Sequence, residues 1–129
     1  MKRILMAAVA ALAWPAAGPA QEYQVGGYMA WIGPEDLYNS SGQRLGDAVS
    51  ILRQDRANFH RFGIRHQGDE ADPWFGQQAA RQAMEGMFRA GGGILPAFQQ
   101  MIMAGNVPVW VTIYAVDGNF TALRAEIPG

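Results

Sequence analysis

Residues 107–127, VPVWVTIYAVDGNFTALRAEI, decide the fold that this sequence predicts. Between positions 107 and 114, apolar β-branched residues occupy every second position, which is the period of a strand. Residues 117–119 (DGN) have the composition of a tight turn, and the alternation resumes over 120–127. The segment therefore predicts a C-terminal β-hairpin, which needs a covering layer because an isolated hairpin is only marginally stable.

A further strand is predicted far from the hairpin in the sequence. Residues 23–32 (YQVGGYMAWI) are strand-like, although Gly26-Gly27 interrupts the pattern. Gly33-Pro34 ends the strand, and the next residues have the composition of a polar loop.

Three helices are predicted between this strand and the hairpin. The first begins at Asp47, a favourable N-cap, and closes at Gly63, where a left-handed residue is expected. Its apolar stripe consists of Ala48, Ile51, Leu52, Phe59 and Phe62. The second helix begins at the Asp-Pro pair at 72–73 and reaches about position 90, and the third spans 95–104. We therefore expect a small α+β fold with an N-terminal strand, three helices and a C-terminal β-hairpin. The helices pack on one face of a three-stranded sheet.

The N-terminal residues have the pattern of an export signal. Lys2 and Arg3 precede an apolar run over 4–14, and small residues fill 17–20. The apolar run is shorter than the roughly 20 residues that span a bilayer, and no later stretch is long and apolar enough either. We therefore expect a signal peptide at 1–20, one α+β domain at 21–129, no membrane span, and a periplasmic or secreted location in a bacterial envelope.

Composition excludes several classes of function. The net charge is −1, and it becomes more negative when Lys2 and Arg3 leave with the leader, which argues against nucleic-acid binding. With no cysteine, the chain has no disulfide framework, no thiolate metal site, no Cys nucleophile and no covalently attached haem. We expect no cofactor.

Asp55 stands on the apolar stripe of the first predicted helix. A bare carboxylate there would cost several kcal/mol unless a cation or backbone donors pair with it. One interpretation is a structural ion pair with Arg44 or Arg124. The alternatives are a carboxylate tuned by burial for acid/base chemistry and simple exposure at a bend.

Arg53, Arg56 and His60 share one flank of the same helix, beside the apolar stripe. Arginine offers fixed donors for carboxylate-bearing ligands or acidic protein surfaces, so we predict a ligand-binding role for this flank. The helix dipole alone also favours cations near a helix C-terminus, which gives His60 a purely structural explanation.

Metal binding receives only weak support from the sequence. The ligand types are present in His60, His66, Asp69, Glu70 and Asp72, but their spacing fixes no geometry and there is no His-Glu-x-x-His pattern. Negative charge at the start of the second predicted helix explains the three carboxylates equally well. We therefore predict no metal.

A serine hydrolase is the enzymatic alternative. Ser40 or Ser41 would be the nucleophile, with His60 as general base and Asp55 orienting it, but no Gly-x-Ser-x-Gly elbow is present. This hypothesis requires His60, Asp55 and a serine to meet in one concave pocket.

Trp110 and Tyr114 share one face of the predicted hairpin. If the helices cover the Val109, Val111 and Ile113 face, the two rings lie together on the outside and can anchor a ligand; the opposite packing remains open. The leading hypothesis is a non-catalytic binding module that recognises an envelope protein or a cell-wall or glycan ligand. The alternative is a small periplasmic hydrolase that uses His60, Asp55 and nearby arginines.

Overall fold

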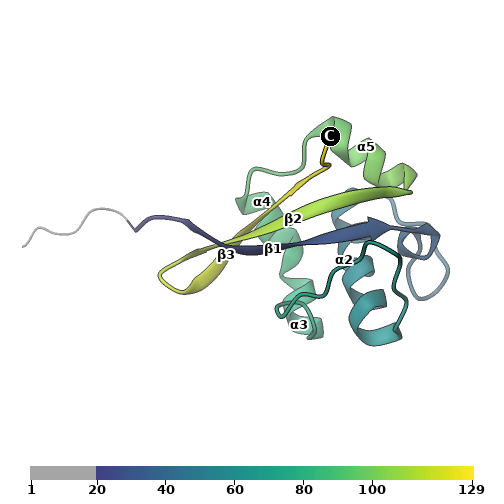
Figure 1. Cartoon of the computed structure of the whole chain (residues 1–129), viewed down its shortest axis with the longest axis horizontal. Coiled ribbons are helices and arrows are strands. Elements are labelled where there is room, and N and C mark those ends of the chain that lie inside the picture. Colours follow the sequence, from purple (N-terminus) through teal and green to yellow (C-terminus); the bar gives the residue numbers. More distant parts are fainter. Residues whose placement is uncertain (1–19) are drawn as a thin grey trace, which may run out of the picture.

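The structure, a computed structural model, describes residues 20–129 (Figure 1). The predicted signal peptide therefore lies outside the described residues, apart from Ala20. Among the residues that are described, no helix has the length and apolar character needed to cross a bilayer.

The sheet contains β1 (Tyr23–Ile32), β2 (Val107–Val116) and β3 (Asn119–Glu126). All neighbours are antiparallel and the spatial order is β1-β2-β3, so the predicted hairpin forms and β1 pairs with its first strand. A register shift between Gln24 and Gly26 marks the interruption that the glycine pair predicted. One end of the sheet extends beyond the helices (Figure 1).

The helices occupy the chain between β1 and β2. In chain order they are a short 3-10 turn η1 (Pro34–Leu37), α2 (Ala48–Ala57), a π-helical turn η2 (Asn58–Phe62), α3 (Gln78–Gln82), α4 (Met84–Ala90) and α5 (Pro96–Ala104). Asp47 caps α2 by accepting a hydrogen bond from the Ser50 amide, and Gly63 closes η2 at φ 70°. The predicted α+β class, with helices packed against a three-stranded sheet, is confirmed.

The second predicted helix was placed wrongly at its start. It begins at Gln78 instead of Asp72, and it is divided at Ala83 into α3 and α4. Asp72 does accept hydrogen bonds from the backbone amides of Trp74 and Phe75, as a capping residue would. Its other carboxylate oxygen is held by side chains of α2 and η2, so residues 72–77 form a connecting loop against that helix.

The core lies between the sheet and the helices. The alternation over 107–114 places Val109, Val111 and Ile113 in one buried cluster with Leu52 and Phe88. This is the face that the helices cover, so the structure decides between the two packings that the sequence left open.

A strap formed by residues 66–72 covers half of the free edge of β1. The Glu70 amide donates to the Met29 carbonyl, and its carboxylate accepts from the Met29 amide at 2.8 Å. Asp69 accepts from the Trp31 amide at 2.7 Å. These carboxylates take the place of a fourth strand and satisfy backbone groups that an open edge would expose. The prediction that Asp69, Glu70 and Asp72 decorate a helix N-terminus is therefore wrong.

Candidate functional site

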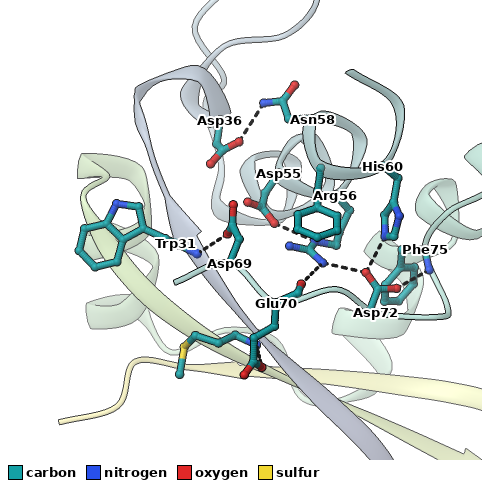
Figure 2. A network of polar contacts seen from close by, with 12 residues as sticks. Trp31, Asp36, Asp55, Arg56, Asn58, His60, Asp69, Glu70, Asp72 and Phe75 are labelled. Carbon is teal, nitrogen blue, oxygen red and sulfur yellow. Dashed lines mark hydrogen bonds and ion pairs between the residues drawn. The ribbon is translucent and has the colours of Figure 1, made fainter. Parts of the chain in front are cut away.

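Arg56 lies in the interior, not on a ligand-binding flank. Its side chain is fully buried, with Nε 2.8 Å from Asp55 Oδ2 and Nη1 2.8 Å from Asp72 Oδ1 (Figure 2). Nη1 also donates to the Glu70 carbonyl at 3.0 Å, and the guanidinium lies 4.2 Å from the centroid of the Tyr28 ring. We call Asp55, Arg56 and Asp72 the internal ion cluster; it joins α2 to the strap.

Asp55 is buried and paired, as its place on the apolar stripe predicted, but its partner is Arg56. The two partners considered from the sequence are engaged elsewhere: Arg44 donates to backbone carbonyls and Arg124 pairs with Glu22. Burial raises the pKa of Asp55 well above its usual range, and the charge of Arg56 acts in the opposite direction. The paired geometry favours the structural interpretation of this residue.

His60 meets Asp72, not Asp55. Its Nε2 lies 2.7 Å from Asp72 Oδ1, the oxygen that also accepts from Arg56 (Figure 2). Burial acts to raise the pKa of Asp72, but the hydrogen bonds from His60 and Arg56 outweigh it and hold this pKa below its usual value. Ser40 lines a cavity to which His60 does not contribute, so the structure does not bring together the constellation that the hydrolase hypothesis requires.

Trp110 and Tyr114 lie on the face of the sheet opposite the core, but each is half-buried. Trp110 lies over Gly27, where an added Cβ would come within 2.8 Å of the indole ring. The guanidinium of Arg124 lies 4.1 Å from the centroid of the Tyr114 ring. The two rings therefore do not form an open aromatic patch.

A different set of cations lines a cavity of about 440 Å³ between α2, η2 and α3. Its charged lining residues are Arg53, Arg61 and Arg81, and no aspartate or glutamate contributes to it. We call this cavity the arginine pocket. Its volume lies within the range of small-molecule sites, about 300–1,000 Å³.

The helical turn η2 helps to place two of these arginines together. The Gly63 amide bonds to the Asn58 carbonyl, five residues back, so this turn is wider than an α-helical one. The wider turn brings Arg61 nearly in line with Arg53 and Ala57, and all three line the pocket. Arg53 is thus the one member of the predicted flank that faces a cavity.

Arg81 contributes a fixed donor from the opposite wall. It is only 6% exposed, and Nη1 donates to the carbonyls of Phe75 and Gly76 at 3.0 Å each. Burial, followed by the charge of Arg61, lowers the pKa of Arg81, and the charge of Asp72 acts in the opposite direction. The backbone carbonyls therefore orient the Arg81 guanidinium, and Arg61 is a second cation close to it.

None of the three pocket arginines has a carboxylate within 4 Å among residues 20–129, whereas Arg56 and Arg124 do. Neighbouring like charges without counterions are unfavourable, and an anion entering the pocket would relieve them. Arg61 and Arg81 were not among the predicted site residues. They lie 20 residues apart in the sequence, and no local pattern indicates that they meet. Only the fold places Arg81 opposite Arg61.

The second histidine belongs to a different group of side chains. His66 Nε2 lies 2.7 Å from Glu35 Oε1, and Nδ1 lies 3.6 Å from Asp36 Oδ2 and 3.5 Å from Asp69 Oδ2. Over the described part of the chain, no group of three or more His, Asp or Glu side chains has an arrangement that could hold a metal ion.

Comparison with protein-family models, with curated proteins and with solved structures finds no significant match to this chain. Functional inference therefore starts from the arrangement of its own residues.

Proposed function

We propose that this chain is an exported, non-catalytic binding module of the bacterial envelope that recognises an anionic group in the arginine pocket. The observation that carries the proposal is the convergence of Arg53, Arg61 and Arg81 on one cavity whose lining, among residues 20–129, includes no carboxylate. The charge of Asp72 acts on Arg81 from outside that lining. Export rests on the order of charged, apolar and small residues over 1–20.

The chemistry of the pocket fits a carboxylate or a phosphate. A guanidinium offers donors in a planar fork that matches two oxygens of either group, and it remains charged at any physiological pH. Because Arg81 is already held by two carbonyls, little of its conformational entropy is lost when a ligand binds.

The binding experiment titrates a 15N-labelled protein of residues 21–129 with inorganic phosphate or acetate. The observable is the NMR chemical shift of each arginine Nε–Hε group. We expect saturable shifts at Arg53, Arg61 and Arg81, and weaker ones in Arg61→Gln. Arg89 lies on the surface beside Glu85, so Arg89→Gln is the matched control and should bind as wild type does. Equal, non-saturating shifts at all arginines, including Arg44 and Arg124, would contradict an anion site.

The export part of the proposal has its own test. Full-length protein recovered from a bacterial host should have an N-terminus at or within a few residues of Gln21 by mass spectrometry. An intact N-terminus at Met1 in a cytoplasmic fraction would contradict it.

A further inference from the structure

A second cavity of about 250 Å³ adjoins the arginine pocket. The two share Asn39, Ser40, Gln54 and Phe62 as lining residues, so they lie side by side, and we call them together the groove. We call the second cavity the aromatic cleft, since Tyr38, Phe62 and Ile64 supply its apolar surface.

The two aromatic rings of the cleft are exposed to solvent, and each lies against an arginine. Tyr38 is 45% exposed and Phe62 44% exposed. Tyr38 forms an isolated antiparallel bridge with Arg44, whose guanidinium lies 5.8 Å from the Tyr38 ring centroid. The guanidinium of Arg61 lies 5.1 Å from the Phe62 ring centroid, and Phe62 lines both cavities. Exposed rings beside a polar cavity are typical of ligand contact surfaces.

Apart from its arginines, the arginine pocket is lined by neutral residues that are rich in hydrogen-bonding groups. Ser40, Ser50, Gln54, Gln78 and Gln82 line the arginine pocket. Within residues 20–129 the side chains of Gln78 and Gln82 make no hydrogen bond to another protein group. Their amide groups can both donate and accept hydrogen bonds. Such a lining suits a ligand that carries several hydroxyl groups.

The aromatic cleft contains no arginine, and its single carboxylate, Glu35, is paired with His66. A second anionic group beside Glu35 would therefore meet a carboxylate, while the guanidinium groups of Arg44 and Arg61 lie against the Tyr38 and Phe62 rings. Hydroxyl groups, by contrast, can donate to that carboxylate. The groove thus matches a ligand with one acidic end and one neutral, hydroxylated end.

We propose, on the basis of the proposed anion-binding function, that the ligand is an acidic glycan with a uronic acid joined to a neutral sugar. The carboxylate of the uronic acid lies among Arg53, Arg61 and Arg81. The neutral sugar ring packs against Tyr38 and Phe62, with its hydroxyl groups toward Glu35 and Gln54.

The experiment is isothermal titration of residues 21–129 with cellobiouronic acid, cellobiose, glucuronic acid and inorganic phosphate. Cellobiouronic acid and cellobiose differ only in one carboxylate. We expect cellobiouronic acid to bind about tenfold more tightly than cellobiose or glucuronic acid.

Matched variants separate the two cavities of the groove. Arg61→Gln should weaken the binding of both cellobiouronic acid and phosphate. Tyr38→Ala should weaken cellobiouronic acid binding about fivefold while phosphate binds as it does to wild type, because Tyr38 lines only the aromatic cleft. Phe62→Ala should weaken cellobiouronic acid binding about fivefold and phosphate binding as well, because Phe62 also lines the arginine pocket and Arg61 lies against its ring. Tyr23 is similarly exposed but far from the groove, so Tyr23→Ala is the control and should change neither. Thermal melting checks that each variant is folded.

The glycan inference is overturned if cellobiouronic acid binds no more tightly than glucuronic acid, or if both aromatic variants bind it as wild type does. It is also overturned if a short acidic peptide competes with cellobiouronic acid for the groove and binds with a lower dissociation constant than cellobiouronic acid does. In each of these cases the anion-binding function stands as long as phosphate perturbs the pocket arginines. If neither phosphate nor cellobiouronic acid perturbs them, the proposed function fails with the inference.

Discussion

Arg53 and Arg56 lie three residues apart on α2, yet the fold gives them opposite environments. Arg56 is fully buried and bonded to Asp55 and Asp72. Arg53 lines a cavity beside two other arginines, with no carboxylate within 4 Å of it among residues 20–129. The segments that pack beside a helix flank therefore decide whether its arginines are buried in an ion pair or line a cavity. Here these are the strap for Arg56 and α3 for Arg53.

The difference has an energetic basis. In the internal ion cluster the cation is paired with carboxylates of the same chain, so removing Arg56 leaves two carboxylates buried without their partner. The arginine pocket is not neutralised, so removing one member lowers repulsion and takes away a donor for a ligand. The first arrangement links α2 to the strap, and the second is available for binding.

The largest expected effect is on stability, from Arg56→Met. This variant leaves the carboxylates of Asp55 and Asp72 buried without their cation and should lower the free energy of unfolding by about 3–5 kcal/mol. Urea unfolding followed by tryptophan fluorescence measures it. Arg89→Met, at an exposed helix position, should stay within about 0.5 kcal/mol of wild type. If both variants are equally stable, the internal ion cluster does not stabilise the fold.

The strap offers a second, intermediate effect. Asp69→Ala leaves the amides of Trp31 and His66 without an acceptor and should cost about 1–3 kcal/mol. Glu70→Ala removes one exposed hydrogen bond to Met29 and should cost less than about 1 kcal/mol. The same unfolding measurement ranks the two. A larger loss for Glu70→Ala would mean that the edge of β1 is held by contacts other than the Asp69 carboxylate.

Arg61→Gln should separate binding from stability. Since the change removes one of several neighbouring cations, the free energy of unfolding should stay within about 0.5 kcal/mol of wild type or rise slightly. Phosphate binding should weaken markedly in the same preparation. A large loss of stability would assign Arg61 to the scaffold, as with Arg56.

The smallest expected effect is a pH dependence at His66. Burial acts to lower the pKa of His66, but the hydrogen bond to Glu35 and the charges of Asp36 and Asp69 outweigh it, and the pKa is raised above 6.5. The folded protein therefore binds this proton more tightly than the unfolded chain does. The resulting stabilisation is complete below pH 6.5 and is lost as the pH rises through the raised pKa of the folded state.

Urea unfolding of wild type and His66→Gln between pH 6 and 9 tests this dependence. The free energy of unfolding of wild type should exceed that of His66→Gln at pH 6, and this difference should shrink as the pH rises to 9. In Glu35→Gln the free energy of unfolding should depend less on pH than it does in wild type. A constant difference between wild type and His66→Gln would show that the proton on His66 is not coupled to folding.

Much of the fold could be predicted because its signals are local. The alternation over 107–114, the turn residues 117–119 and the glycine that closes η2 all act within a few positions. The start of the second helix could not be predicted. The Asp-Pro pair at 72–73 is typical of a helix N-terminus, but the Asp72 carboxylate accepts hydrogen bonds both from its own turn and from Arg56, 16 residues earlier. The strap was also missed, since pairing with the edge of β1 joins residues about 40 positions apart.

The site was predicted less completely. The burial of Asp55 follows from its place on the apolar stripe. Of the predicted flank, Arg53 lines the arginine pocket, and its role in ligand binding stays a prediction. The sequence could not show that Arg56 points inward, because this requires Asp72 to fold back beside it. Nor could it place Arg81 opposite Arg61, since the loop between them has no period that fixes its path.

The wide turn η2 also lets the pocket tolerate a change of chain length. An α-helix advances about 100° per residue, so two residues seven positions apart lie only about 20° apart around its axis. Losing one residue between Asn58 and Arg61 would tighten η2 to an α-helical turn and leave Arg61 seven positions after Arg53. Both arginines would then still lie on the same side of the helix.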